Sequence, residues 1–199
     1  MAQSREGKSK GERTRERVID AAATLVNRQG LSGTSVGDII RATGVKKGNL
    51  YFHFAGKDEI GIAVLEKARR EYLAYLAANA KGDRALDRLG GVVDAVVRFH
   101  RRNGFTGGCI FGNTALETGD TNPRFAAFVR GVFDEWSGLL ERLLLEARDE
   151  GDLPDGIDPP SFARLIVASL EGGIMMARLS KDGRDLYVHS QGTDVVPLE

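Results

Sequence analysis

The spacing of apolar residues restricts this chain to helices. Between residues 18 and 26 apolar side chains recur at i, i+4, i+7 and i+8, the period of one helix face, and Gly30 follows where a helix C-terminus often places a glycine. Similar periods fill much of the chain, and no segment shows the alternation between hairpin turns that marks strands. The sequence therefore predicts an all-α fold.

Local start and stop signals divide this pattern into about nine helices. Asn122 and Asp158 each precede a proline, so a capping side chain stands ahead of a residue favoured at the first helical position. The expected helices cover residues 12–28, a segment capped by Thr34 or Ser35 that ends at Gly44, 46–53, 57–79, 84–102, 110–118, 123–149 and 159–180, followed by a short or irregular element after residue 183.

Charge is divided unevenly along the chain. The 28 Lys and Arg residues balance the 28 Asp and Glu residues, yet residues 1–57 hold 11 of the basic residues and five of the acidic ones, a net charge of +6. The remaining residues therefore carry −6. This division is expected if only the first part contacts a polyanion such as a nucleic acid. An ordinary solvated charge imbalance is the alternative.

Residues 44–57, GVKKGNLYFHFAGK, predict a short basic and aromatic helix that follows a tight turn at Gly44. Two helices joined by such a turn form a helix-turn-helix, whose second helix lies in the major groove of DNA. At about 100° per residue, Leu50 and Phe54 share one face of this helix. We expect that face to pack inward.

The outer face of the same helix carries Gly48, Asn49 and Phe52. Glycine lets the backbone approach a surface, an amide can read a base edge, and a phenyl ring can contact a thymine methyl group. The residues placed to reach phosphates beside this face are Lys46, Lys47, Tyr51 and His53. The alternative is that the aromatic residues belong to the core, but three aromatics within four positions cannot all point inward from one helix.

This first part of the chain resembles the DNA-binding domain of the TetR/AcrR family of bacterial transcriptional regulators. The matching segments are residues 14–26 (TRERVIDAAATLV), Gly30, 34–40 (TSVGDII), 44–54 (GVKKGNLYFHF) and Lys57. The resemblance implies that the DNA-facing residues are Lys47, Gly48, Asn49, Tyr51, Phe52 and His53, with Thr34 or Ser35 and Lys57 on flanking phosphates.

The segment departs from the family pattern in two places. Lys46 stands where a small capping residue is usual, and Ala55-Gly56 replaces the common Pro-Ser. A lysine side chain cannot accept the backbone hydrogen bond that a cap accepts. We therefore expect the recognition helix to have a less stable start, or to become ordered only on DNA.

The composition and the resemblance together predict the domain organisation. Residues 1–11 are expected to form a disordered basic arm, 12–56 a helix-turn-helix domain, 57–80 a connecting helix and 81–199 a ligand-binding and dimerisation domain. The dimer is expected through residues 161–179, which are apolar on more than one side and contain two adjacent glycines. The expected partners are a second copy, a double-stranded DNA operator and an unidentified small-molecule effector. The sequence therefore predicts that the protein is a ligand-responsive repressor.

Residues 107–117, GGCIFGNTALE, resemble a subgroup of the family in which the helix after a Gly-Cys pair lines the small-molecule pocket. In some relatives the matching cysteine senses electrophiles or oxidants, so Cys109 is a candidate sensor; a packed, inert thiol is the alternative. The expected pocket residues are Phe99, Phe105, Cys109, Phe111, Asn113, Trp136 and Met175. Core packing is the alternative for the apolar ones, while His100, Asn113 and Glu117 are either polar contacts or surface residues.

Other classes of protein receive little support. A single cysteine excludes an intramolecular disulfide, and three scattered histidines offer no zinc spacing, so we expect no metal and no cofactor. No apolar signal region and no run of about 18 apolar residues occurs, which predicts a soluble cytoplasmic protein with no membrane contact. Motifs for an activated nucleophile or a phosphate loop are missing, so no enzyme activity is expected. The alternatives are a helical small-molecule enzyme and a nucleoid-type binder without an effector.

Overall fold

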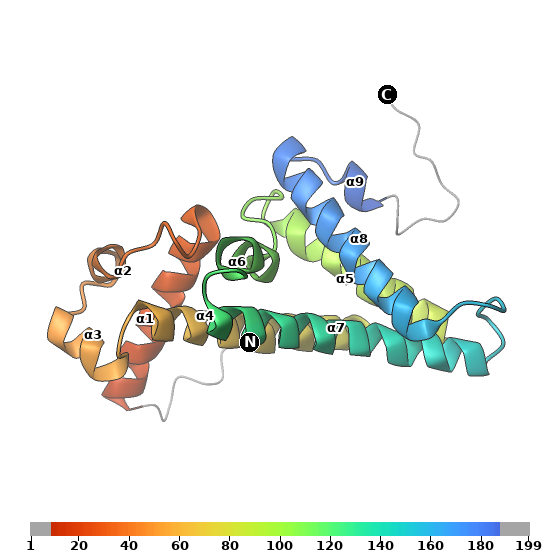
Figure 1. Cartoon of the computed structure of the whole chain (residues 1–199), viewed down its shortest axis with the longest axis horizontal. Coiled ribbons are helices and arrows are strands. Elements are labelled where there is room, and N and C mark those ends of the chain that lie inside the picture. The colour runs from red at the N-terminus through yellow and green to blue at the C-terminus, as the bar shows by residue number, and fades with distance from the viewer. Residues whose placement is uncertain (1–8, 188–199) are drawn as a thin grey trace.

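The computed structural model describes residues 9–187, which form nine α-helices and no strand (Figure 1). The helices are α1 (Lys10–Gln29), α2 (Val36–Thr43), α3 (Lys47–His53), α4 (Lys57–Asn79), α5 (Ala85–Arg102), α6 (Ile110–Thr118), α7 (Pro123–Asp149), α8 (Pro159–Ser180) and α9 (Arg184–Tyr187). The predicted all-α fold is confirmed. Residues 1–8, most of the expected arm, and the tail from residue 188 lie outside the described residues.

The helix boundaries follow the local signals in the sequence. The side chains of Asn122 and Asp158 accept backbone N–H groups in the first turns of α7 and α8, as predicted for caps. One signal was missed: Ser9 and Glu12 form a capping box, in which each side chain accepts the backbone N–H of the other. Because of this box, α1 begins at Lys10 rather than at residue 12.

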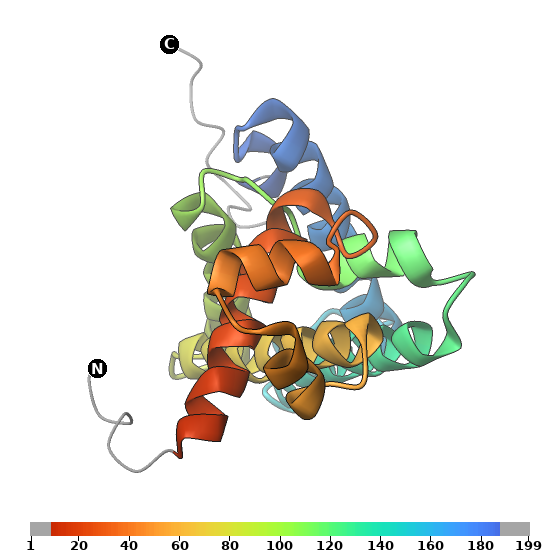
Figure 2. The ribbon, with the colours of Figure 1, turned by 90° about the vertical axis from the view of Figure 1, so that its left-hand side faces the viewer.

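The first three helices and the start of α4 enclose a small N-terminal core (Figure 2). The buried residues at its centre are Val18, Ile39, Leu50, Phe54 and Ile60. α2 ends at Gly44, whose φ of 65° lies in the left-handed region that glycine adopts without strain. This turn joins α2 to α3 and completes the predicted helix-turn-helix.

α4 connects this domain to the rest of the molecule. Its first half contributes Ile60 and Val64 to the small core, and its second half contributes Tyr72 and Leu76 to a larger core. In Figure 1 the helix runs from the N-terminal helices alongside α7. The two cores are therefore joined by one continuous helix.

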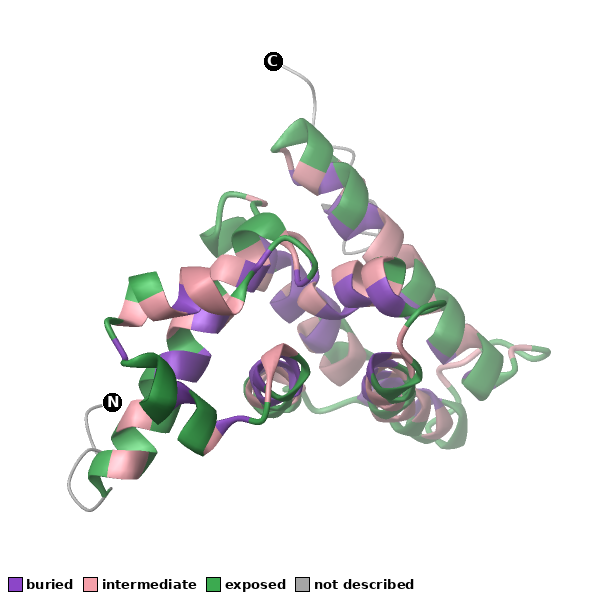
Figure 3. Cartoon of the chain, turned by 60° about the vertical axis from the view of Figure 1, so that its left-hand side comes forward, coloured by how far each residue is buried: buried purple, intermediate pink, exposed green. Residues whose placement is uncertain are grey.

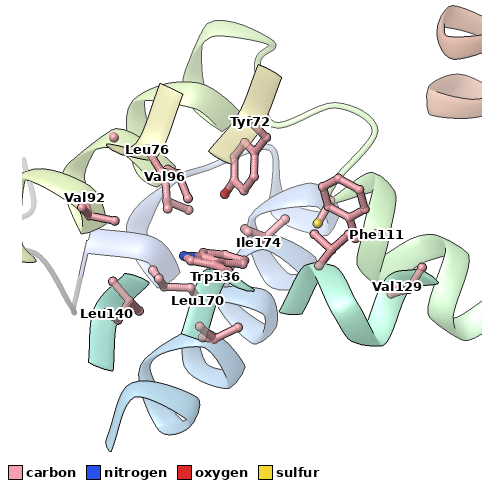
Figure 4. Packing of buried hydrophobic residues seen from close by; sticks show 14 of the residues in the cluster. Tyr72, Leu76, Val92, Val96, Phe111, Val129, Trp136, Leu140, Leu170 and Ile174 are labelled. Carbon is pink, nitrogen blue, oxygen red and sulfur yellow. The ribbon is translucent and has the colours of Figure 1, made fainter. Parts of the chain in front are cut away.

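The larger core lies among α4, α5, α6, α7 and α8. At its centre the fully buried ring of Trp136 meets the ring of Tyr72 edge-on, with 5.5 Å between the ring centroids (Figure 4). Figure 3 shows buried positions on the inward sides of the helices and exposed positions on the outside. Across residues 9–187, no helix combines the length and the apolar character needed to cross a membrane.

Candidate nucleic-acid interface and small-molecule cavity

α3 presents one face to solvent and anchors itself with the other. The side chain of Phe52 is 82% exposed, whereas Leu50 and Phe54 are buried in the small core. Gly48 and Asn49 lie on the exposed side with Phe52. The predicted inward and outward faces are confirmed, and DNA contact by the outward face stays a prediction.

The fold itself does not require the glycine on this face. A Cβ atom added at Gly48 would meet no other atom within 4 Å. The packing of the protein would therefore accept a larger residue there. A small residue beside an exposed phenyl ring suits a helix whose backbone comes close to an outside surface, as in the major groove of DNA.

Basic and aromatic side chains border the exposed face. Lys46 and Lys47 are exposed, Tyr51 is 44% exposed, and the half-buried ring of His53 lies edge-on to Phe52 with 5.1 Å between centroids. α3 starts without a side-chain cap, because Lys46 occupies the capping position and accepts no hydrogen bond through its side chain. The missing cap agrees with the sequence, and the helix is formed in the structure without DNA. The lower stability of its start stays a prediction.

The other predicted phosphate contacts lie at the turn before α2 and at the start of α4. Thr34 is only 2% exposed, and its hydroxyl donates to the carbonyl of Gly30 at 2.7 Å, so of the predicted alternatives Thr34 and Ser35 the structure favours Ser35 for a phosphate contact. The exposed Ser35 caps α2. The ammonium of Lys57 donates to the carbonyl of Ser32 at 3.1 Å, which ties α4 to the same turn. Ser35 and Lys57 stay in the predicted set.

A carboxylate from the C-terminal helices also holds this turn. Glu117, on α6, accepts the backbone N–H of Ser32 at 2.7 Å. Gly30 leaves room for it, since an added Cβ there would lie 2.6 Å from Glu117 Oε1. Figures 1 and 2 show α6 between α8 and the segment that follows α1. From the sequence Glu117 is expected to be a pocket contact or a surface residue, whereas the structure shows that Glu117 accepts a hydrogen bond from the turn before α2.

A cavity of about 580 Å³, here called the main cavity, lies between α6, α7 and α8. This volume falls within the range of about 300 to 1,000 Å³ that is usual for small-molecule sites. Three predicted pocket residues, Cys109, Asn113 and Met175, line it. Glu171 and Arg178 on α8 also line it and were missed, because helical periodicity does not show which polar residue faces a neighbouring helix.

A second cavity of about 310 Å³ shares Cys109 with the main cavity. The predicted pocket residues Phe99 and Phe111 line this second cavity. Phe105 and Trp136 line neither, so these cavities give their prediction as pocket residues no support. Trp136 is fully buried in the larger core, and Phe105 packs against that core from the loop after α5.

Burial changes the ionisation of the groups beside the cavities. It raises the pKa of Glu171 to about 7 and raises the pKa of the Cys109 thiol well above its usual value. It lowers the pKa of His100 to about 4. At neutral pH Cys109 is therefore a thiol and His100 is uncharged. In the described part of the chain, no three His, Cys, Asp or Glu side chains gather as metal ligands would.

The arrangement defines a class of protein. A three-helix domain exposes one helix of a helix-turn-helix, and a separate helical domain contains a partly open cavity of ligand size. Residues 18–64 match the family model described as bacterial regulatory proteins of the tetR family, and residues 85–191 match the tetracyclin repressor-like C-terminal domain. The chain belongs to the TetR family of bacterial transcriptional regulators.

Individual relatives agree with this membership. Transcriptional regulator AcuR of Cereibacter sphaeroides is 32% identical over 165 residues, which cover 81% of this chain and 75% of the relative. The structure of a TetR transcriptional regulator from Chloroflexus aurantiacus matches with a TM-score of 0.83 and 34% identity, covering 90% of this chain and 91% of that one. The regulatory protein TetR from Rhodobacter sphaeroides matches with a TM-score of 0.79 and 30% identity, covering 88% and 94% of the two chains.

Proposed function

We propose that this protein is a homodimeric repressor that leaves a palindromic operator when a small molecule occupies the main cavity. One observation carries the proposal: α6 lines the cavity through Cys109 and Asn113, and the same helix holds the turn before α2 through Glu117. A ligand that displaces α6 therefore moves the helix-turn-helix. Coupling between two such sites is typically about 1 to 3 kcal/mol, or roughly 5-fold to 150-fold in affinity.

A second copy is needed to read enough base pairs. Outside the main cavity, α8 exposes three large apolar side chains, Leu165, Met176 and Leu179. Several exposed apolar side chains on one helix support pairing with another copy, and two-fold symmetry places two recognition helices on half-sites about 34 Å or a multiple apart. Movement of α6 would change that separation and lower operator affinity.

Selection of bound sequences from random DNA tests this function. The full chain is expected to enrich a palindrome whose half-sites are separated by one helical turn or a multiple. A thermal-shift screen of small molecules, followed by operator-release assays on the hits, then tests ligand response. Recovery of DNA without a sequence preference would contradict the proposal and favour a nucleoid-type binder.

Operator affinity is expected to depend steeply on salt. The exposed Lys46 and Lys47 lie beside the readout face on each copy, so most of the contacts should go to phosphates. With six or more phosphate contacts per dimer, the affinity should fall about 10³-fold between 50 and 200 mM salt. Fluorescence anisotropy of labelled operator across that range measures the slope. A salt-independent Kd would contradict phosphate-based binding.

Thiol sensing through Cys109 is an alternative mechanism for the same repressor, taken from the resemblance to the Gly-Cys subgroup. Burial and the raised pKa of Cys109 favour the packed thiol instead. We expect N-ethylmaleimide to modify the native protein at least about 100-fold more slowly than the denatured chain, as followed by mass spectrometry. Rapid native modification with loss of operator binding would support sensing, and unchanged binding by fully alkylated protein would exclude it.

A further inference from the structure

We propose that Glu171 makes the main cavity selective for amines, so that the preferred ligand has an apolar body and a protonated amino group. This inference rests on the proposed function, because it assigns a chemical class to the effector of that same cavity. Glu171 lines the cavity, its Oε1 atom lacks a hydrogen-bond partner within residues 9–187, and Arg178 in the same wall is already bonded to Asn113.

Glu171 lies in the wall with an incomplete set of partners. Its Oε1 atom is buried and has no hydrogen-bond partner among the described residues. Its Oε2 atom lies against the first turn of α6 at Gly112, where an added Cβ would collide with it. The carboxyl group has the Cys109 thiol as one hydrogen-bond partner, but its buried Oε1 has none in the described part of the chain. A buried carboxylate oxygen without a partner is costly, so a ligand that brings an N–H⁺ donor supplies the missing interaction.

Of the two cations among the described residues of the same wall, one already has a partner and the other is exposed. Arg178 donates to the side-chain oxygen of Asn113 at 2.9 Å, and the Asn113 amide donates to the carbonyl of Gly107 at 2.6 Å. This guanidinium therefore holds the loop before α6. Arg164 lines the cavity but is exposed to water, which weakens any pairing with a ligand.

The rest of the wall determines the body of the ligand. Val167 and Ile174 lie on α8 on either side of Glu171 in the sequence, and Phe133 and Met175 also line the cavity. These side chains favour a hydrocarbon chain or ring over a polar one. An amine with such a body would place its apolar part against them and its charged end at Glu171.

The pH dependence of binding distinguishes an amine from an acid. Burial raises the pKa of Glu171 to about 7, so an amine must displace a proton to bind below that pH. The titratable groups that interact with this carboxyl from neighbouring elements are Cys109 at the start of α6 and Tyr72 on α4, while Asp134 on α7 and Arg164 and Arg178 on α8 line the same cavity. Burial raises the pKa values of Cys109 and Tyr72 well above their usual values, so neither ionises between pH 6 and 8. Amine affinity should therefore rise roughly tenfold from pH 6 to pH 8, and affinity for a carboxylic acid should fall.

Isothermal titration calorimetry of the full chain with octylamine, 1-octanol and octanoate tests the proposal at both pH values. At pH 8 octylamine is expected to bind at least about tenfold more tightly than 1-octanol, and octanoate most weakly. In Glu171→Gln the preference for the amine and its pH dependence should disappear while 1-octanol still binds, which shows that the cavity is intact. Glu66→Gln removes an exposed carboxylate on α4 outside the cavity and should behave as the wild type.

Three outcomes would overturn the selectivity: no binding of octylamine, equal or tighter binding of octanoate, or an amine preference that survives in Glu171→Gln. The proposed function has a separate readout, which is release of operator DNA by any probe that binds. If 1-octanol binds and releases the operator while octylamine has no advantage, the repressor proposal stands and the amine selectivity fails. If octylamine binds selectively without changing operator affinity, the selectivity stands and the ligand response fails.

Discussion

The Phe52→Ala variant is expected to lose base preference while it keeps its fold. The ring of Phe52 is 82% exposed, so its removal takes little from the small core. A good base contact contributes about 1 to 3 kcal/mol of discrimination, and a dimer uses each contact twice. The ratio of operator affinity to random-DNA affinity should therefore fall by about 30-fold to 10⁴-fold, as measured by anisotropy with both DNAs.

Neighbouring residues supply the controls for Phe52→Ala. Phe54→Ala makes the same side-chain change at a buried position and should destabilise the domain by about 3 to 5 kcal/mol, visible as a lower Tm. Lys47→Ala should weaken operator and random DNA alike, because a phosphate contact does not depend on sequence. If both Phe52→Ala and Asn49→Ala kept the original base preference, the exposed face of α3 would not be the readout face.

The Glu117→Ala variant should bind DNA but respond weakly to an effector. The carboxylate of Glu117 accepts a hydrogen bond from the backbone N–H of Ser32. A hydrogen bond to a charged group contributes about 1.5 to 3 kcal/mol to stability. This is comparable to the whole coupling energy of a typical regulator, about 1 to 3 kcal/mol. The ratio of operator Kd with and without effector, expected at 5-fold to 150-fold in the wild type, should fall to less than about twofold.

The matched control is Glu117→Gln, which keeps an oxygen that can accept the Ser32 N–H. That variant should retain most of the ligand response, whereas Glu117→Ala should lose it. Effector affinity for the isolated protein should stay the same in both variants, because Glu117 lines neither cavity. A wild-type response in Glu117→Ala would show that coupling passes through other contacts, such as α4.

The sequence predicted the helices and the orientation of α3 well because both depend on local physics. Proline with a capping residue marked the starts of α7 and α8, and a period of 3.6 residues separated the inward Leu50 from the outward Phe52. The sequence left the choice between Thr34 and Ser35 open for a related reason. A threonine before a helix can cap or turn inward, and only the position of the Gly30 carbonyl decides between the two.

The cavity was predicted less well because it depends on contacts between distant helices. Helical periodicity places both Trp136 and Met175 on apolar stretches. In the structure Trp136 lies in the larger core, whereas Met175 lines the main cavity. Glu171 was missed because a single acid in an apolar helix resembles a surface residue until the neighbouring α6 is in place. The same holds for Glu117, whose partner Ser32 lies 85 positions away in the chain.

The contact between Gly30 and Glu117 has a consequence for domain exchange. Regulators with new operators could be built by joining another recognition domain to this cavity domain, and α4 would be the natural place to join them. The structure indicates that a junction in α4 is insufficient, because the donated domain must also bring a small residue at position 30 and a free N–H two positions later. A chimera with a bulky residue there would displace the Glu117 carboxylate from the Ser32 N–H, and the contact between α6 and the turn before α2 would be lost.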